Sequence, residues 1–409
     1  MTIAAESRLW FVVMFVGQGG LIGISRQFHF MAASVREIIE SYNPDAPLAE
    51  ACTPPASWYF DQGILELERK TVFSCSWQMV GRVEQIREPG QYITCEVAGE
   101  PILVVRGNDG VLRGFFNVCR HHAAAVMTNP EGRTETLRCP YHGWTYNLDG
   151  ALVLTPEFGG VRDFDRSANG LIPVETAISE NWVFVKLISE GPSLEDFLGA
   201  DLTGQIRRSS LGKLHWMERR AYTLNCNWKV FVDNYLDGGY HVPHLHRGLS
   251  SIFDAAKYTI ETGERFCLQS SPISTDDKTD AQTAAARKGD RALYYWIYPN
   301  LMINYYEGVM DTNLVYPRGI DRTEVIFNFY FADNSASAQE RNLASIAVSE
   351  RIQAEDVAIC ESVQHGLASR TYNTGRLSLR REAGEHLFHR LLYVDLKSGL
   401  SNEGSYPPY

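Results

Sequence analysis

Two short segments of this chain each contain one cysteine and one histidine, and 17 residues separate the segments. The four side chains, in order, are Cys119, His121, Cys139 and His142. Two thiolates and two imidazoles suit a [2Fe–2S] cluster with two cysteines on one iron and two histidines on the other. Zinc is the alternative for these residue types, although zinc sites usually pair two cysteines and then two histidines. We therefore predict an iron–sulfur cluster, and His122 is a spare histidine whose spacing fits less well.

A second group of potential ligands lies between Asp233 and His246, where three histidines and two aspartates occur within fourteen residues. Iron(II) commonly binds two histidines and one carboxylate on one face, which leaves the opposite positions for oxygen. His241 and His246 are five residues apart, which a regular helix would not place on one side. We expect Pro243 to break the helix and return His246 toward the metal. His244 is the competing ligand, and a purely structural histidine cluster is the less favoured interpretation.

The carboxylate ligand is expected in the helical stretch 352–367, whose apolar residues recur at spacings of seven, four and four. These residues, which would share one face of the helix, are Ile352, Ile359, Val363 and Leu367. Asp356 lies in the middle of that face, where a carboxylate is costly unless it is paired or binds a metal. Asp356 is the predicted third ligand, with a buried salt bridge as the alternative, and Glu355 is expected to point elsewhere.

The composition describes a globular protein with more than one core. The chain has 409 residues, 44% of them hydrophobic and 21% charged, which suits two folded domains. A net charge of −11 argues against binding to nucleic acid and allows a cationic substrate. Six of the eight cysteines lie singly outside the cluster motif, as is usual for proteins of reducing compartments.

The elements around the first motif read as short strands. The β-rich runs Pro101–Val105, Gly114–Val118 and Trp182–Lys186 are separated by turn signals such as Asn108-Asp109-Gly110. A small antiparallel β domain that carries the cluster on two loops is the natural interpretation. The sequence shows no Gly-rich nucleotide-binding loop, so we expect another protein to deliver the electrons.

The N-terminal extension, residues 1–35, differs from the rest of the chain. The apolar run from Leu9 to Val16 is too short for a transmembrane helix, and the residues after it are rich in glycine. A transit or signal segment is one interpretation, but we favour a start at Met31. We therefore expect a cytoplasmic protein without a membrane span, with the chloroplast stroma as the alternative if the extension is a real transit segment.

Together these motifs resemble the oxygenase (α) component of the Rieske non-haem iron oxygenases over about residues 60–370. Phe116–His121 and Cys139–Trp144 are similar to the two ligand loops of a Rieske domain. Asn227–Lys229 followed by Asp233–Pro243 is similar to choline monooxygenase and its relatives. The resemblance implies an α+β fold, with a small antiparallel β Rieske domain and a helix-grip (START-like) catalytic domain built on a central antiparallel sheet. The expected domains are a helical lead-in packing on the catalytic domain (36–72), the Rieske domain (73–188) and the catalytic domain (189–409).

The resemblance also implies the two metal centres. It places a Rieske [2Fe–2S] cluster on the two Cys/His pairs and a mononuclear Fe(II) on His241, His246 and Asp356. Family members use an acid just before the first iron histidine to bridge the two centres between neighbouring subunits. In most of them the acid lies three residues before that histidine, where this chain has Gly238. Asp237, four residues before, is one helical turn away and is the expected bridge; Asp233 is the fallback.

The implied activity is hydroxylation of a small substrate by O2, with electrons from a ferredoxin or flavin reductase, in a head-to-tail homotrimer. A choline-like quaternary ammonium compound is the expected substrate. The alternatives are an aromatic-ring hydroxylating dioxygenase α subunit and a Rieske electron carrier without catalytic iron. Tyr294, Trp296 and Tyr298 alternate along a predicted strand and could bind a cation, although an aromatic strand that fills the core is the favoured interpretation.

Overall fold

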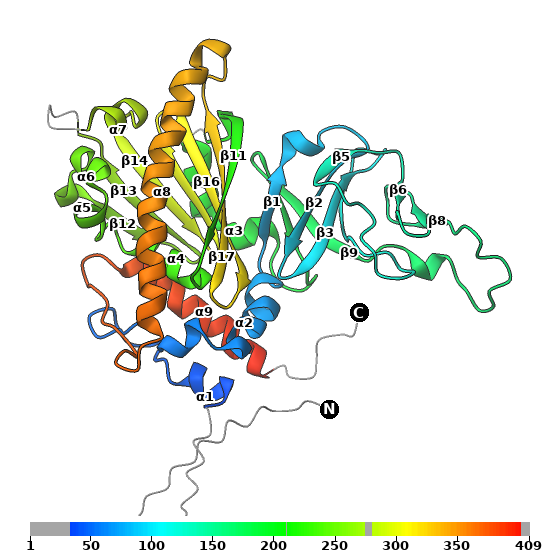
Figure 1. The fold of residues 1–409 in the computed structure, drawn as a ribbon, viewed down its shortest axis with the longest axis horizontal. Coiled ribbons are helices and arrows are strands. Elements are labelled where there is room, and N and C mark those ends of the chain that lie inside the picture. The colour runs from blue at the N-terminus through cyan, green and yellow to red at the C-terminus, as the bar shows by residue number, and fades with distance from the viewer. Residues whose placement is uncertain (1–32, 210, 275–279, 402–409) are drawn as a thin grey trace, which may run out of the picture.

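The computed structural model describes residues 33–209, 211–274 and 280–401. Within these ranges the chain forms two large antiparallel sheets that stand side by side, with helices around the second (Figure 1). The predicted α+β architecture is therefore confirmed. Most of the N-terminal extension falls outside the described residues, and the interpretation of it stays a prediction. The domain limits at 72 and 188 also stay a prediction, which we retain as a proposal.

The first sheet has seven strands, with the order β1-β10-β9-β4-β3-β2-β5. Their bounds are β1 (Gln78–Arg82), β2 (Gln91–Val97), β3 (Glu100–Arg106), β4 (Leu112–Phe116), β5 (Glu131–Arg133), β9 (Pro173–Ser179) and β10 (Trp182–Lys186). A smaller sheet holds β6 (Leu137–Arg138), β7 (Thr145–Tyr146) and β8 (Leu152–Leu154). The runs expected to be strands correspond to β3, β4 and β10, with β4 beginning two residues earlier than predicted. The two Cys/His segments lie in the β4–β5 and β6–β7 loops.

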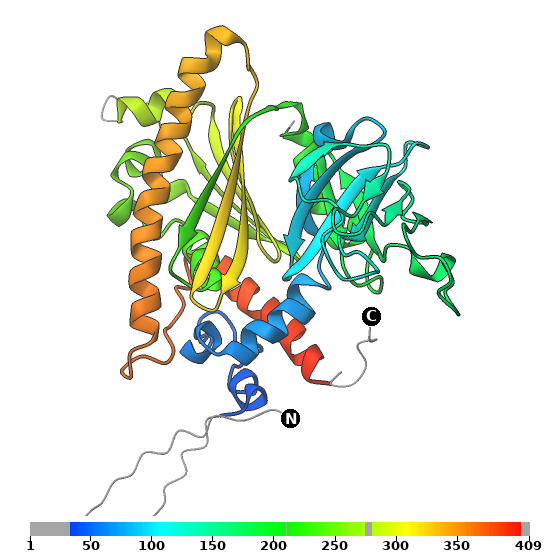
Figure 2. The ribbon, with the colours of Figure 1, turned by 45° about the vertical axis from the view of Figure 1, so that its right-hand side comes forward.

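The second sheet has seven antiparallel strands in the order β11-β17-β16-β15-β14-β13-β12. The bounds are β11 (His215–Leu224), β12 (Thr259–Thr262), β13 (Phe266–Pro272), β14 (Arg291–Ile297), β15 (Leu301–Tyr306), β16 (Val309–Gly319) and β17 (Arg322–Phe331). Its helices are α3 (Leu194–Arg208), α4 (Trp228–Leu236), α5 (Val242–Leu245), α6 (Arg247–Ile252), α7 (Ala281–Ala286), α8 (Gln339–Leu367) and α9 (Ala383–Ser401). The long helix α8 runs along this sheet in both ribbon views (Figures 1 and 2).

The N-terminal helices α1 (Val35–Glu40) and α2 (Gln62–Glu68) pack against α9. Ser34 caps α1, and Glu37 completes the capping box. A fully buried ion pair attaches α2 to α4: Lys229 Nζ lies 2.6 Å from Glu68 Oε1. The indole Nε1 of Trp228 donates to the other oxygen of Glu68 at 2.8 Å. The start of the described chain is thus tied to the helix that precedes the predicted iron ligands.

The prediction of an apolar inner face on α8 is wrong in part. Ile359 and Val363 are exposed, whereas Ser345, Ser349 and Gln353 are buried. The inner face is polar because this part of α8 lines a cavity in front of the sheet instead of packing into the hydrophobic core. Asp356 still faces inward, because it lies one turn beyond that buried polar row.

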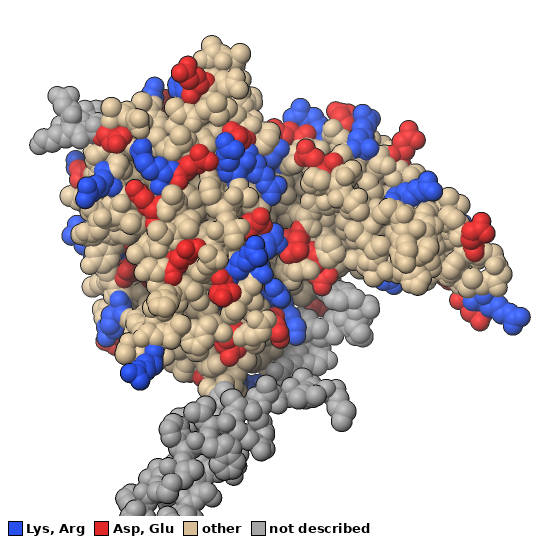
Figure 3. All heavy atoms as spheres, viewed as in Figure 1, with Lys and Arg blue, Asp and Glu red and all other residues tan. Residues whose placement is uncertain are grey.

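The surface carries both signs of charge. On the face shown in Figure 3, Lys and Arg are interspersed with Asp and Glu and form no large patch of one sign. No helix within the described residues is long and apolar enough to cross a membrane.

Candidate metal centres and substrate cavity

The two cysteines of the first motif are buried at the end of the first domain. Each begins a tight turn: Ala123 N donates to Cys119 O, and Gly143 N donates to Cys139 O. The hydroxyl of Tyr146 lies 3.4 Å from Cys119 Sγ. Burial raises the pKa of the Cys139 thiol, and the neighbouring Cys119 raises it further. Two adjacent buried sulfurs therefore need a cation to become thiolates, as a cluster iron would provide.

The histidines of the same loops lie together. The rings of His121 and His142 are 4.7 Å apart, and His121 stacks on Trp144 at 4.7 Å with an interplanar angle of 7°. Nδ1 of His121 is buried without a protein partner, while His122 and His142 are exposed. One pair of thiols and one pair of imidazoles fit the two irons of a Rieske cluster. His122 lies in the same group, so the choice of His121 over His122 still rests on the sequence spacing.

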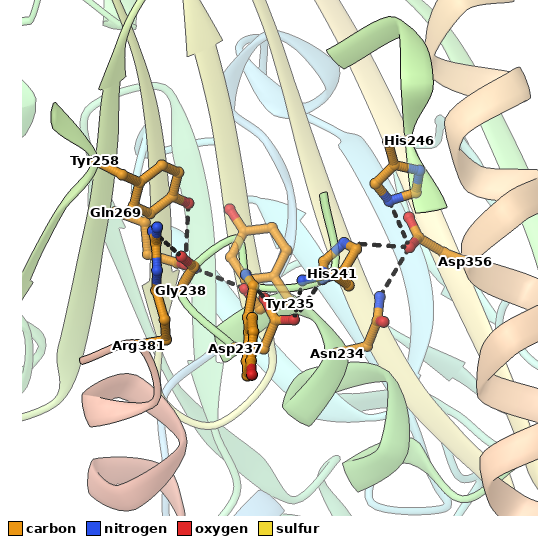
Figure 4. A network of polar contacts seen from close by, with 11 residues as sticks. Asn234, Tyr235, Asp237, Gly238, His241, His246, Tyr258, Gln269, Asp356 and Arg381 are labelled. Atoms are coloured by element: carbon orange, nitrogen blue, oxygen red, sulfur yellow. Dashed lines mark hydrogen bonds and ion pairs between the residues drawn. The ribbon is translucent and has the colours of Figure 1, made fainter. Parts of the chain in front are cut away.

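The second predicted set also comes together. Nε2 of His246 lies 3.1 Å from Asp356 Oδ1, and Nε2 of His241 lies 3.9 Å from the same oxygen. Figure 4 shows both imidazoles directed at Asp356. The set is two imidazoles and one carboxylate within reach of a single ion, which fits the donor preference of non-haem iron(II). Asn234 Nδ2 donates to Asp356 Oδ1 at 2.9 Å and orients that carboxylate.

The far nitrogens of both histidines are held by carboxylates. His241 Nδ1 donates to Asp237 Oδ2, and His246 Nδ1 donates to Glu355 Oε2, both at 2.6 Å. Such contacts fix the ring tautomer so that Nε2 faces the metal. Burial lowers the pKa of His246, but the Asp356 and Glu355 contacts raise it more, so the net pKa is above its usual value. The expectation that Glu355 points elsewhere is wrong. Glu355 is next to Asp356 on α8, and its longer side chain also reaches His246.

The expected helix break at Pro243 is wrong: α4 has already ended at Leu236, and Pro243 lies in the first turn of α5, which His246 follows. The turn that brings His241 toward Asp356 is made by two glycines. Helix α4 ends at Leu236, and Gly238 and Gly239 both have positive φ angles of 68° and 67°. A Cβ on Gly238 would lie 2.1 Å from the carbonyl oxygen of Arg381, so an acid cannot occupy that position. Asp237 meets His241 through this turn instead of along a helix face, and it also accepts from His241 N at 2.9 Å.

The two competing residues lie elsewhere. His244 is exposed on α5 and does not line the cavity. Asp233 points toward the terminal helices, where it accepts from Tyr59 Oη at 2.7 Å and His389 Nε2 at 2.9 Å. Both of its carboxylate oxygens are thus used away from His241, an arrangement that favours Asp237 over Asp233 as the bridge.

A cavity of about 760 Å³, including its open mouth, lies between α8 and the second sheet. Its aromatic lining includes Phe231, Phe253, Tyr258, Tyr294 and Tyr306. Of the predicted aromatic wall only Tyr294 reaches it. The indole of Trp296 packs on Phe388, and Tyr298 Oη donates to Asp395 at 2.6 Å, because α9 covers that end of β14.

The cavity also contains buried charges that the sequence reasoning missed. Asp311 on β16 and Arg287 just after α7 both line it. A signal for the first was present, since Asp311 and Asn313 alternate along an otherwise apolar run and must share one face of a strand. Nothing local marks Arg287, which reaches the cavity only through the tertiary fold.

Two family models match this chain. The model for the ring hydroxylating alpha subunit (catalytic domain) matches residues 211–394, and the Rieske [2Fe-2S] domain model matches residues 76–165. The chloroplastic choline monooxygenase of Arabidopsis thaliana is 39% identical, over 91% of this chain and 90% of that protein. The carnitine monooxygenase oxygenase subunit of Escherichia coli (strain K12) is 31% identical, over 84% of this chain and 93% of that protein.

Solved structures agree with this relationship. A quaternary ammonium Rieske monooxygenase aligns with a TM-score of 0.76 at 27% identity, over 88% of this chain and 98% of that chain. A naphthalene 1,2-dioxygenase aligns with a TM-score of 0.72 at 18% identity, over 87% and 95% of the two chains, which shows a shared fold.

A cluster-bearing β domain beside a sheet with a two-histidine, one-carboxylate site defines an iron-dependent oxygenase. The chain belongs to the Rieske non-haem iron oxygenases, as an oxygenase (α) subunit related to the choline and carnitine monooxygenases. Its cofactors are those of the family, a Rieske [2Fe–2S] cluster and a mononuclear non-haem iron. A match over the catalytic domain sets aside the electron-carrier alternative.

Proposed function

We propose that this oxygenase hydroxylates a small quaternary ammonium compound. The observation that carries the proposal is the aromatic cavity beside His241, His246 and Asp356, which contains the buried carboxylate of Asp311. Aromatic faces and a carboxylate attract a cation that has no hydrogen-bond donors. The relatives named above are choline and carnitine monooxygenases, and this supports the same class of substrate. Two buried charged groups suit a flat hydrocarbon poorly, so the aromatic dioxygenase alternative is not favoured.

We assign the cluster to Cys119, His121, Cys139 and His142, and the iron to His241, His246 and Asp356. When bound, the cluster supplies electrons singly and the iron supplies oxygen activation for insertion into a C–H bond. The protein's own part is positioning. Asp237 and Glu355 hold the two imidazoles, Asn234 holds Asp356, and the surrounding aromatic rings limit the access of water.

We propose that electrons pass between neighbouring subunits of a homotrimer. Within one chain the cluster loops lie at the outer end of the first domain, whereas the iron ligands lie beyond the second sheet (Figure 1). His142 and Tyr141 are exposed at that outer end, Tyr141 by 65%, so they can meet another subunit. Asp237 would accept an N–H bond from a cluster histidine of that subunit while it holds His241.

The electron donor is proposed to be a separate ferredoxin or flavin reductase, since the sequence has no Gly-rich nucleotide-binding loop. A cytoplasmic location stays a prediction, and the chloroplast stroma stays its alternative. The plant relatives are described as chloroplastic.

The proposed function is tested by substrate-dependent oxygen uptake in the reconstituted protein. Choline, glycine betaine, carnitine and aromatic acids are offered one at a time, with a ferredoxin and its reductase as the electron source. We expect uptake and a stoichiometric hydroxylated product with at least one quaternary ammonium compound, and about three irons per chain. Coupled uptake with an aromatic acid alone would refute the proposal.

A further inference from the structure

We infer that the substrate is a zwitterion, whose carboxylate binds Arg287 and Gln353 while its ammonium group lies among Asp311 and the aromatic rings. The inference rests on the proposed function and narrows it, from quaternary ammonium compounds in general to those that also carry a carboxylate. Among the described residues that line the cavity, Arg287 and Asp311 have opposite charges, and neither has an ion-pair partner at contact distance.

The positive charge belongs to Arg287, whose side chain is only 3% exposed. Nη1 and Nη2 donate to Ser345 Oγ at 2.8 Å and Ser349 Oγ at 2.6 Å. The guanidinium lies 4.7 Å from the centre of the Tyr306 ring. Among the described residues no carboxylate lies within ion-pair distance of it, and Nε has no partner. A buried guanidinium held only by neutral groups is costly, and an anion would compensate it.

Gln353 provides a second unpartnered donor on the same wall. It is 2% exposed, it lines the cavity, and its Nε2 has no hydrogen-bond partner. It follows Ser349 by one turn of α8, so its side chain is next in the row that holds Arg287. Two buried N–H donors without acceptors require an acceptor. A carboxylate provides several and bonds strongly to a guanidinium.

The negative charge belongs to Asp311, which is 4% exposed on the sheet wall. It accepts from Asn304 Nδ2 at 2.7 Å and Asn313 Nδ2 at 2.8 Å, and within the described ranges no cation lies at ion-pair distance. Burial raises the pKa of Asp311, although the charge of Arg287 and the two amides lower it, and the net pKa is raised. A cation beside this carboxylate would stabilise its ionised form.

The end of the cavity that contains Arg287 and the predicted iron ligand Asp356 are separated along α8. Arg287 is attached at Ser349 and Ser345, and Asp356 lies seven residues beyond Ser349, which is about 10 Å along the helix axis. A carboxylate anchored at Arg287 therefore leaves the rest of an elongated molecule extending toward the iron ligands. The ammonium end and the carbons near it become the part that is presented for oxidation.

The test compares two ligands that differ only in the carboxylate. The holoenzyme is titrated by calorimetry with γ-butyrobetaine and with the neutral carboxamide of the same compound. We expect the carboxylate form to bind at least about tenfold more tightly, with choline resembling the amide. Equal binding of the three would overturn the zwitterion inference and leave the proposed function standing. If none of the three binds while an aromatic acid does, the proposed function itself fails.

Variants then show which residues cause the preference for the ligand with a carboxylate. Arg287→Gln should reduce the ratio of the two dissociation constants to about one, mainly by weakening the carboxylate form. Asp311→Asn should weaken both ligands by a similar factor. The matched control is Arg351→Gln, since Arg351 also links α8 to α7, through Thr283, without lining the cavity. The cluster absorption and melting temperature of each variant report folding, and Gln353→Met replaces Arg287→Gln if that variant does not fold. An unchanged ratio in a folded Arg287 or Gln353 variant would contradict the assignment.

Discussion

At the scale of single residues, the proposed iron site depends on two outer carboxylates as well as on its three proposed ligands. Asp237 and Glu355 each accept from Nδ1 of one histidine at 2.6 Å, so both rings are fixed in the tautomer that presents Nε2. The two acids differ in surroundings. Asp237 follows α4 as its C-cap residue and also accepts from Tyr240 N in the following turn, whereas Glu355 bonds to His246 alone among the bonds described. Their replacement should therefore have different consequences.

Replacing Glu355 with glutamine should weaken iron binding about 10–100-fold. The amide can still accept from His246 Nδ1, but the negative charge that makes the ring a better ligand is lost. Iron content is measured during titration with a chelator, while the cluster absorption should stay unchanged. Glu340→Gln, at the exposed start of the same helix, is the matched control. A Glu355 variant that holds iron as the wild type does would show that the contact is not needed.

Replacing Asp237 with asparagine should leave both metal centres in place and slow electron passage between them severely. An amide matches the carboxylate in shape, but its NH2 cannot accept N–H bonds from two imidazoles. The measurement is a single turnover, in which the cluster is reduced chemically, oxygen and substrate are added, and cluster reoxidation is followed. Asp233→Asn is the comparison, because its carboxylate bonds Tyr59 and His389 instead. Fast, coupled reoxidation in the Asp237 variant would refute its role.

Cation binding should depend on the ionisation of Asp311. Because the folded pKa of Asp311 is raised above 3.8, the carboxylate loses its charge at a higher pH than an exposed aspartate does. The affinity for γ-butyrobetaine carboxamide should therefore be full above that pKa and fall as pH drops through it. The titratable groups that interact electrostatically with Asp311 are Arg287, Tyr306, Tyr235 and Tyr222, none of which changes charge in the acid range. Asp311→Asn should remove the dependence; an unchanged pH profile in that variant would contradict it.

At the scale of elements, the sequence identifies candidate ligands that the structure brings together, but it predicts the surfaces that carry them less well. Cys119, His121, Cys139 and His142 stand out because their types and spacing are rare and local. The choice of Asp356 came from an apolar periodicity that α8 follows only in part, since Ile359 and Val363 are exposed. A helix that lines a polar cavity buries serine and glutamine, and apolar periodicity cannot reveal that. Arg287 was missed because its partners, Ser345 and Ser349, are about sixty residues away in the sequence.

Removing one partner of the buried ion pair between α2 and α4 should strongly destabilise the fold. Glu68 and Lys229 are both fully buried at 2.6 Å, and burial lowers the pKa of Lys229 although Glu68 raises it. Glu68→Gln leaves an uncompensated ammonium, so we expect destabilisation of about 3–5 kcal/mol, measured by chemical denaturation. Glu66→Gln, exposed on the same helix, should have little effect. A loss in Glu68→Gln no larger than in that control would contradict the prediction.

At the scale of the whole molecule, each chain carries a cluster and an iron site. If electrons pass between subunits, the cluster of one chain does not reduce the iron of the same chain. Two inactive variants should then complement one another. Cys139→Ala removes the cluster and keeps the iron site, whereas Asp356→Ala removes the iron and keeps the cluster. Each variant alone should be inactive in hydroxylation, and the other centre should remain visible by absorption or iron content.

Co-expression of these two variants should restore activity. In a randomly mixed head-to-tail trimer, an intact cluster faces an intact iron site at about one contact in four, so about a quarter of the wild-type activity per chain is expected. Transfer within one chain predicts none, because no chain has both centres. Sedimentation of the mixed sample checks that the trimer forms, and wild type diluted with Cys139→Ala controls for altered assembly. Mixed trimers that form but stay inactive would show that Asp237 does not join centres of neighbouring subunits.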